Sequence, residues 1–223
     1  ITVQALETAA AISKALILEP IKEGFSEYEL MLNSLQTTMT GTGLSAEEVQ
    51  KQLDRLDEYA DKTVYSTRDM LDNLPKFTNA GVELEPATTA MIGIANAAAH
   101  AGKGAREASI AYYNLGQSIA TGYLSRIDYN SVNNAGIATL QWKEAMVEAA
   151  IAQGTLTKVN ENAYQAGNKV FALQELFIEG LQERWATTDV MMKVFGDYGS
   201  EFTEIGKKAM AAAQDIRDYH MLM

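Results

Sequence analysis

The chain has 223 residues, of which 47% are hydrophobic and 21% charged, ordinary proportions for a protein that buries a core. The absence of cysteine excludes a disulfide scaffold, a cysteine-ligated zinc site and a thiol nucleophile. The net charge of −11 argues against an electrostatic nucleic-acid binder.

The charge is unevenly distributed. Residues 1–85 carry −8 and residues 143–223 carry −4, whereas residues 86–142 carry only +1. The longest uncharged runs in this middle block have 17 and 18 residues and are diluted by Ala, Gly, Thr, Ser, Asn and Gln. Both fall short of the ~20 strongly apolar residues that cross a bilayer. A buried helical hairpin is therefore preferred, and membrane insertion is kept as the alternative.

The N-terminal part of the chain has a helical pattern. Helical runs over 3–18 and 23–39 are separated by Pro20 and end at a Gly/Thr loop, 40–43. Residues 45–48, Ser-Ala-Glu-Glu, form a capping box that begins another helix. One apolar face of that helix is formed by Val49, Leu53, Leu56 and Ala60.

The next helix is predicted to begin after Ser66, and Pro75 must kink it or end it. Two glycines, Gly81 and Gly136, each follow Asn-Ala and precede a β-branched residue. This pattern is typical of a helix that ends in a Schellman motif, with glycine in the left-handed conformation. We therefore expect a helix end at both positions.

Helices continue through the middle of the chain. Pro86 is expected at the first position of an Ala-rich helix that runs to Ala101 and stops at Gly102. The apolar period of the following helix comprises Ala108, Ala111, Leu115, Ile119 and Tyr123. A further helix is predicted around 140–151, closed by Gly154.

Two more helices are predicted in the C-terminal part. The first has its apolar period at Val170, Leu173, Phe177, Leu181 and Trp185. The second is expected to be capped by Ser200 and to carry a narrow seam for another helix, from this chain or from a copy. The seam consists of Phe202, Ile205, Ala209, Ala212, Ile216, Tyr219 and Met223. No alternating strand pattern is found.

These elements predict an all-α fold: a compact multi-helix bundle with an Ala-rich central hairpin and amphipathic, heptad-like flanking helices. We expect one helical domain over 1–223, with N-terminal helices and a loop at 1–43, a core at 44–154 and C-terminal helices at 155–223. The sequence starts without methionine or a basic leader and stops inside a helical pattern. It is therefore expected to be a fragment of a longer chain.

No catalytic, metal or cofactor site is predicted. His100 and His220 are far apart and lack the spacing of zinc ligands. The carboxylates at 54–61 and 175–183 alternate with Lys or Arg, which indicates solvated helix faces. Gly102-Lys103-Gly104 lacks the preceding strand and the spacing of a phosphate loop.

Several stretches together resemble one known family, the tape-measure domain of tail proteins of long-tailed bacteriophages and prophages. The resemblance covers about 30–223 and is strongest in Tyr-Asn-Ser-Val-Asn-Asn-Ala-Gly-Ile, 129–137. The residues that match the motif of the family are Asn130, Ser131, Asn134, Ala135 and Gly136. Supporting stretches are Leu-Gln-Thr at 35–37, Gly-Thr-Gly-Leu-Ser at 41–45, Tyr-Ala-Asp-Lys-Thr at 59–63, Tyr-Ser-Thr-Arg-Asp-Met at 65–70 and the region 198–217.

The resemblance implies a structural protein rather than an enzyme. Members of the family occupy the lumen of the tail tube and set tail length. It also implies several partners. These are further copies of the chain, tail-tube proteins, tail-tip or baseplate proteins, and tail-assembly chaperones. The implied location is the virion tail lumen, and the host cytoplasm during assembly. No cofactor and no tight nucleic-acid binding are expected. Contact with a membrane is expected only during genome delivery. The alternative function is a membrane-inserting helical pore or conduit that uses residues 86–142.

Overall fold

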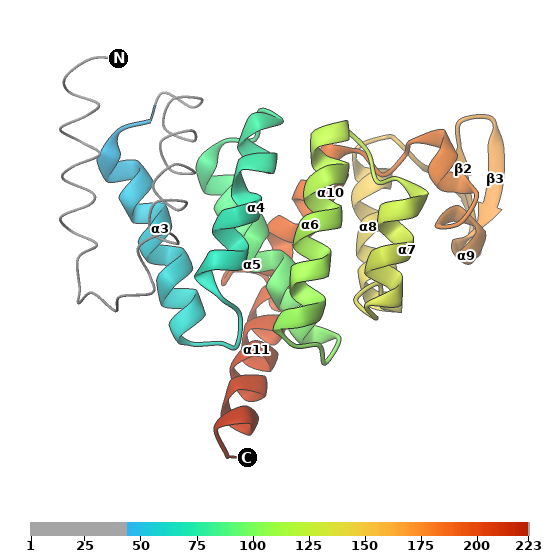
Figure 1. Ribbon diagram of the computed structural model, residues 1–223. Coiled ribbons are helices and arrows are strands. Elements are labelled where there is room, and N and C mark those ends of the chain that lie inside the picture. The colour runs from blue at the N-terminus through green and yellow to red at the C-terminus, as the bar shows by residue number, and fades with distance from the viewer. Residues whose placement is uncertain (1–43, 223) are drawn as a thin grey trace.

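The computed structural model describes residues 44–222 of the chain (Figure 1), so the helices expected within 1–43 and the seam residue Met223 lie outside the described part. Helices dominate the described residues, which confirms the all-α prediction apart from one small sheet. The helices are α3 (Ala46–Asp61), α4 (Thr67–Asn79), α5 (Leu84–His100), α6 (Ala105–Thr121), α7 (Arg126–Asn134), α8 (Leu140–Ala152), α9 (Leu173–Leu176), α10 (Thr188–Gly199) and α11 (Glu204–Leu222).

Local sequence signals define several helix ends. In the capping box of α3, the Ser45 hydroxyl accepts from the Glu48 N–H at 3.3 Å, and the Glu48 carboxylate accepts from the Ser45 N–H at 2.8 Å. Ser66 caps α4 in the same manner, accepting from the N–H three residues ahead. Both predicted helix starts are confirmed.

The two predicted Schellman stops are also confirmed. Gly81 has φ +89° and Gly136 has φ +76°. The N–H of Val82 donates to the Phe77 carbonyl at 3.1 Å. The N–H of Ile137 donates to the Val132 carbonyl at 3.2 Å, which closes α7 identically.

Pro75 does not end its helix, and Pro86 is not the first residue of its helix. Helix α4 continues through Pro75 as far as Asn79, because the turn beyond the proline carries Phe77, which is completely buried. Helix α5 begins two residues before Pro86, at Leu84. Proline is tolerated throughout the first helical turn, where N–H groups have no partner within the helix.

Helix α5 occupies the centre of the described structure. Helices α3, α4, α6, α10 and α11 all pack against it (Figure 1). Nearly every side chain from Leu84 to Ala99 is buried. With α6 it forms the predicted Ala-rich hairpin, and Gly102 (φ +69°) lies in the connection. Within the low-charge middle of the chain, α5 is thus core. None of the described helices is long and apolar enough to cross a membrane.

The predicted helix through 170–185 is wrong. The chain instead forms an antiparallel sheet in the order β1-β2-β3, then the short α9 and a 3-10 turn at Gly180–Glu183. The strands are β1 (Thr157–Asn160), β2 (Ala163–Ala166) and β3 (Lys169–Ala172). The overlooked signal is Gly167-Asn168 between β2 and β3, with Gly167 at φ +57°. Two such residues are typical of a tight hairpin turn.

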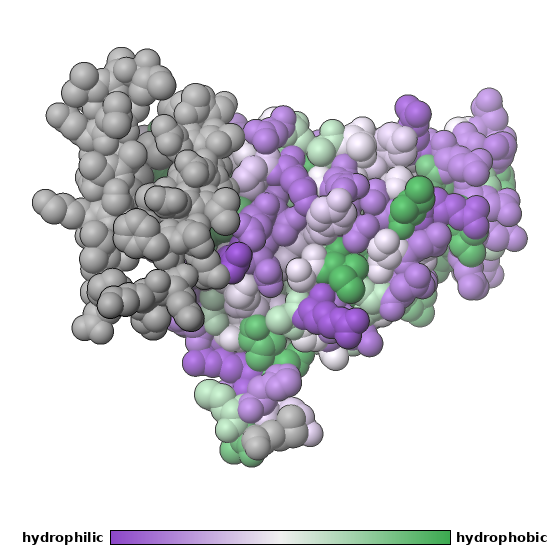
Figure 2. Space-filling model, viewed as in Figure 1, coloured by the Kyte–Doolittle hydropathy of each residue, from purple (hydrophilic) through white to green (hydrophobic). Residues whose placement is uncertain are grey.

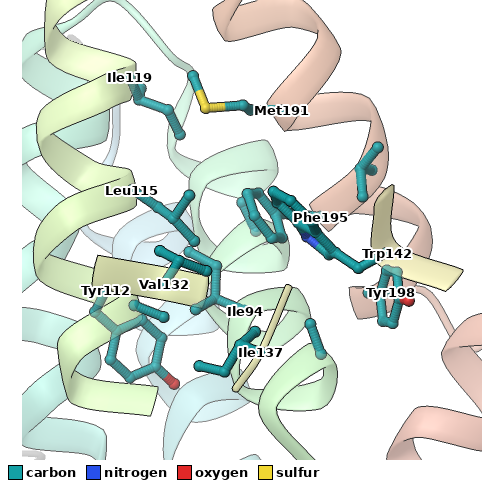
Figure 3. Close-up of a cluster of buried hydrophobic side chains, with 14 of the residues drawn as sticks. Ile94, Tyr112, Leu115, Ile119, Val132, Ile137, Trp142, Met191, Phe195 and Tyr198 are labelled. Atoms are coloured by element: carbon teal, nitrogen blue, oxygen red, sulfur yellow. The ribbon is translucent and has the colours of Figure 1, made fainter. Parts of the chain in front are cut away.

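An aromatic cluster attaches this C-terminal part to the core. The Phe177 ring lies 5.1 Å from Trp185, 5.3 Å from Tyr129 and 5.9 Å from Trp142, measured between ring centroids. Trp142 in turn contacts Phe195 of α10 at 6.4 Å. In Figure 3, α10 side chains point toward Leu115 and Ile119 of α6, so residues far apart in sequence share one core.

Candidate functional surfaces

The described residues do not assemble a metal site. No group of three or more His, Cys, Asp or Glu side chains within 44–222 could hold a metal ion. The His100 ring contacts the Gln141 amide oxygen at 2.6 Å and lies edge-on to Tyr198 at 6.2 Å. His220 stacks edge-on to its neighbour Tyr219 near the end of α11. Neither contact is one that prepares an imidazole for catalysis.

Exposed ion pairs connect oppositely charged side chains on the helix faces. Glu58 pairs with Lys62 at 2.5 Å, and this pairing lowers the pKa of the Glu58 carboxyl. Lys169 and Glu183 pair at 2.7 Å between the sheet and the 3-10 turn, which raises the pKa of the Lys169 ammonium. Exposed pairs of this type contribute little to stability. They keep the helix faces solvated.

Among the described acidic residues, Asp128 is the one that is buried, and its contacts join two helices. It accepts hydrogen bonds from the Ser118 hydroxyl at 2.8 Å and the Ser125 hydroxyl at 2.7 Å. Its own N–H donates to Ser125, the cap of α7. These bonds join the end of α6 to the start of α7 and leave the carboxylate engaged.

A surface cavity of about 500 Å³ lies between the start of α3 and the turn that leads into α5. Glu48, Lys51, Glu83 and Glu85 contribute its charges. Hydrogen bonds from Ser45 lower the pKa of Glu48, so this carboxylate is committed to the helix cap.

The motif residues lie at the end of α7. Asn130 and Asn134 are exposed, whereas Ser131 is half-buried and its hydroxyl donates to the Ile127 carbonyl at 3.2 Å. Ala135 is buried beside Gly136 in the Schellman turn. The motif therefore encodes a helix stop and brings no reactive groups together.

This stop packs against the turn between α5 and α6. A Cβ atom on Gly136 would lie 2.5 Å from Cε of Lys103, so the lysine side chain crosses directly over the glycine. The carbonyl of Lys103 accepts a hydrogen bond from the Tyr65 hydroxyl at 2.7 Å. Three connections, before α4, after α5 and after α7, thus meet at one end of the bundle.

Packing buries part of the α11 seam and leaves other seam residues exposed. Ala209 is completely buried, together with Gly206 and Ala213, where α11 packs against α5. Phe202 is 85% exposed and Tyr219 is 63% exposed. The remaining described seam residues, Ile205, Ala212 and Ile216, are half-buried.

Ser200 does not cap α11, contrary to prediction. It follows α10 in an extended conformation, and α11 begins at Glu204. The hydroxyl of Thr203 accepts from the Gly206 N–H at 3.0 Å and takes the capping role. Phe202 therefore lies in the turn before the helix.

The free end of α11 projects from the body of the molecule (Figure 1), and hydrophobic residues lie at its tip (Figure 2). Besides Tyr219 these are Met221, 66% exposed, and Leu222, 87% exposed. The seam period did not identify these two residues, because they lie off the 3-4 alternation. Elsewhere on this face, Figure 2 shows isolated hydrophobic spots among hydrophilic residues.

Comparison with known proteins identifies a family. A family model described as tape measure protein matches residues 24–161. This range contains the motif residues at the end of α7 and stops within the first hairpin of the sheet, so residues 198–217 lie outside it. No curated protein and no solved structure matches the chain.

Proposed function

The chain belongs to the tape measure protein family and has a structural role in a phage tail, and we propose that it is a segment of the tape measure that occupies the tail-tube lumen and sets tail length. The observation that carries the proposal is the family match over 24–161, which includes the described helices from α3 to α8. Helices suit a ruler because each residue advances a helix by 1.5 Å.

The packing supports one domain. Helices α10 and α11 lie outside the matched range, yet both pack against α5, which lies in the middle of that range. The core at 44–154 and the C-terminal part at 155–223 are therefore proposed to act together. The role requires no catalytic group, cofactor or metal.

The proposed partners are further copies of the chain and the tail-tube, tail-tip or baseplate and chaperone proteins. The exposed end of the α11 seam, at Tyr219, supports a helix as one of these contacts. The charge of −11 supports coexistence with DNA without tight binding. A DNA retardation assay at low salt should show no shift, and the protein should be found in the tail lumen and, during assembly, in the host cytoplasm.

Tail length is the decisive measurement. An in-frame deletion of residues 44–154 in the phage genome removes 111 residues, or about 165 Å of extended helix. Electron microscopy of purified tails should show shortening by up to that length. Loss of the protein from purified tails, while it accumulates in cells, contradicts the proposal. A point variant of the same region that keeps chain length should leave tail length unchanged, provided that tails assemble.

The alternative, a membrane-inserting pore or conduit that uses residues 86–142, would require α5 and α6 to leave the core. The burial of α5 by five helices weighs against that route. Leakage of dye from liposomes by the full chain, with lipid protection of 86–125 from proteolysis, would favour it. Intact liposomes leave the structural role as the function.

A further inference from the structure

The apolar positions of α10 and α11 share one uninterrupted phase. From Met191 onward they alternate at steps of four and three residues, the spacing of a helix seam. The described positions are Met191, Phe195, Tyr198, Phe202, Ile205, Ala209, Ala212, Ile216 and Tyr219. The break at 200–203 falls inside this series without shifting it. Two helices joined by a turn do not need to keep the same spacing of apolar positions across the turn.

Phe202 is the residue that carries the phase across the break. It lies in the turn, and 85% of its surface is exposed. In a continuous helix it would fall between Tyr198 and Ile205 on the same stripe. The compact fold thus leaves exposed an aromatic side chain that a continuous seam would use.

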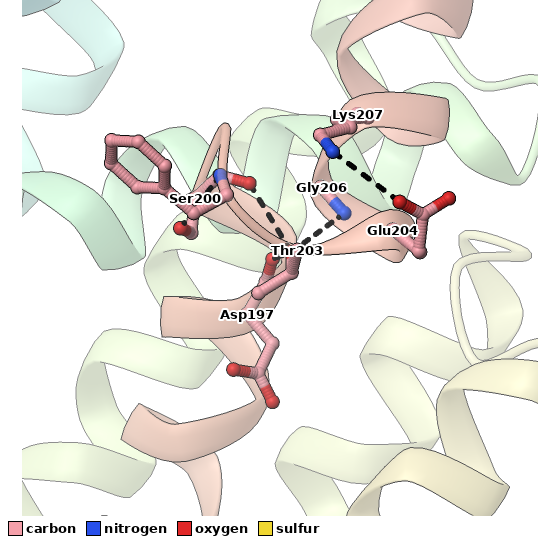
Figure 4. A network of polar contacts seen from close by, with 7 residues as sticks. Asp197, Ser200, Thr203, Glu204, Gly206 and Lys207 are labelled. Atoms are coloured by element: carbon pink, nitrogen blue, oxygen red, sulfur yellow. Dashed lines mark hydrogen bonds and ion pairs between the residues drawn. The ribbon is translucent and has the colours of Figure 1, made fainter.

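A small set of contacts holds the break (Figure 4). The N–H of Thr203 donates to the Ser200 carbonyl at 3.4 Å, which closes a β-turn. The Thr203 hydroxyl contacts the carbonyl oxygens of Asp197 and Ser200 and accepts from the Gly206 N–H. Ser200 leaves helical geometry, at φ −94° and ψ 127°.

Gly206 makes this arrangement possible. A Cβ atom at Gly206 would lie 1.9 Å from the Ser200 carbonyl oxygen and 2.7 Å from the Asp197 carbonyl oxygen. The turn therefore requires glycine at 206, although glycine inside a helix is less favourable than alanine. The contacts of α11 with α5 are made by small side chains, including Ala209 and Ala213.

From these observations we propose that residues 188–222 have a second conformation in which α10 and α11 form one continuous helix, with Phe202 on its seam. Helix α10 stays in the core through Met191 and Phe195, and α11 leaves α5. The continuous helix has 35 residues and a length of about 52 Å. Its use as part of a ruler rests on the proposed function, whereas the helix itself is a property of the chain and is tested without a tail.

The absence of cysteine allows two spin labels to be placed in the full chain. Lys193 in α10 and Gln214 in α11 are both exposed. In a continuous helix the 21 helical steps from K193C to Q214C correspond to about 31 Å, and the turn makes the separation shorter. The control pair, K207C and D218C, lies entirely within α11 and should stay at about 16 Å in both conformations.

Two substitutions act on the break in opposite directions. Gly206→Ala removes the space that the turn needs and favours a helix. Glu201→Pro keeps the turn, because proline suits its second position after the extended Ser200, and it cannot lie inside a continuous helix. The double variant combines both changes.

The 31 Å population should increase at least fivefold in Gly206→Ala over the unsubstituted chain and disappear in Glu201→Pro and in the double variant. A folded Gly206→Ala chain that shows only the shorter distance overturns the proposal, as does broadening of both label pairs, which means melting of α11. If circular dichroism shows that Gly206→Ala does not fold, Thr203→Ala replaces it, because it removes the turn contacts without adding an atom. These results do not depend on tail length, so either proposal can fail alone.

Discussion

Gly93 of α5 lies directly against the carbonyl group of Phe195 in α10: a Cβ atom on Gly93 would be 1.9 Å from that oxygen. One helical turn away, a Cβ atom on Gly199 would lie 2.1 Å from the Thr89 carbonyl oxygen. The two helices therefore meet backbone to backbone, and the fit depends on glycine at both contacts. This close approach places α10 on the central helix.

Gly93→Ala should destabilise the fold strongly, because the new methyl group overlaps backbone atoms that cannot rotate away. We expect a loss of about 3 kcal/mol in the free energy of unfolding, measured by chemical denaturation. Gly196→Ala in α10 is the matched control. A Cβ atom there has no neighbour within 4 Å, so alanine should add up to about 1 kcal/mol. Equal stability of the two variants would contradict the packing of α5 on α10.

Asn96 provides the polar counterpart of this contact. Its side-chain oxygen accepts from the Tyr59 hydroxyl at 2.9 Å, and its side-chain N–H donates to the Tyr198 carbonyl at 2.7 Å. Asn96→Leu leaves both groups buried without this partner and should cost about 2 to 4 kcal/mol. Thermal and chemical unfolding measure the loss.

A double-mutant cycle separates these bonds from general packing. Tyr59→Phe should cost less in the Asn96→Leu background than in the unsubstituted chain, by about 1 kcal/mol. Asn114→Leu, at a half-buried position where the amide bonds only its own helix α6, changes the same residue type and should stay within about 0.5 kcal/mol of the parent. Additive losses in the cycle would mean that the Tyr59 bond contributes nothing.

Helix boundaries were readable where a few adjacent residues determine them. The Ser45 capping box and the glycine stops at 81 and 136 depend only on local geometry, so they appear where predicted. The sheet at 157–172 was missed because its four-residue strands depend on pairing with one another. Spacing alone could not distinguish Val170 of β3 and Leu173 of α9 from two residues on one helical face.

The seam of α11 shows the same division between local and long-range information. The 3-4 spacing of its apolar positions can be read from the sequence, and so can the continuation of that spacing into α10. The predicted Ser200 cap placed the start of α11 too early, because the observed turn depends on the approach of Gly206 to the Ser200 carbonyl. Exposure of Phe202 likewise follows from the docking of α11 on α5. Sequence reasoning therefore identified the stripe and missed which of its residues remain uncovered.

Alkaline pH should destabilise the fold through buried tyrosines. Burial raises the pKa of Tyr198 to about 12, above the ordinary tyrosine value of about 10. Since the unfolded chain ionises first, this contribution to stability is intact below pH 10 and is lost as the pH rises from 10 toward 12. Burial raises the pKa of Tyr59 and Tyr112 as well, so the parent loses stability through several groups.

Tyr198→Phe isolates one of these groups. Within the described residues the Tyr198 hydroxyl has no hydrogen-bond partner, so its removal should leave stability at pH 7 unchanged or raise it by about 1 kcal/mol. Between pH 10 and 12 the variant should lose less stability than the parent, by up to about 1.4 kcal/mol per pH unit. Tyr219→Phe, at an exposed position, should follow the parent. Identical pH profiles for all three chains would contradict the burial of the Tyr198 hydroxyl.

The turn after α7 allows backbone strain and side-chain packing to be measured separately. Gly136 and Gly154 have nearly the same left-handed φ, +76° and +75°, but only Gly136 has a neighbour, the Lys103 side chain. Both alanine variants should lose about 1 to 2 kcal/mol from the left-handed conformation, and Gly136→Ala should lose a few tenths more, because the flexible lysine must move. In the Lys103→Ala background that difference should disappear and the Gly154→Ala loss should stay unchanged. Chemical denaturation of six chains measures this: the parent, the three single variants and the two double variants with Lys103→Ala. A difference that persists without the lysine side chain would show that the turn resists alanine for another reason.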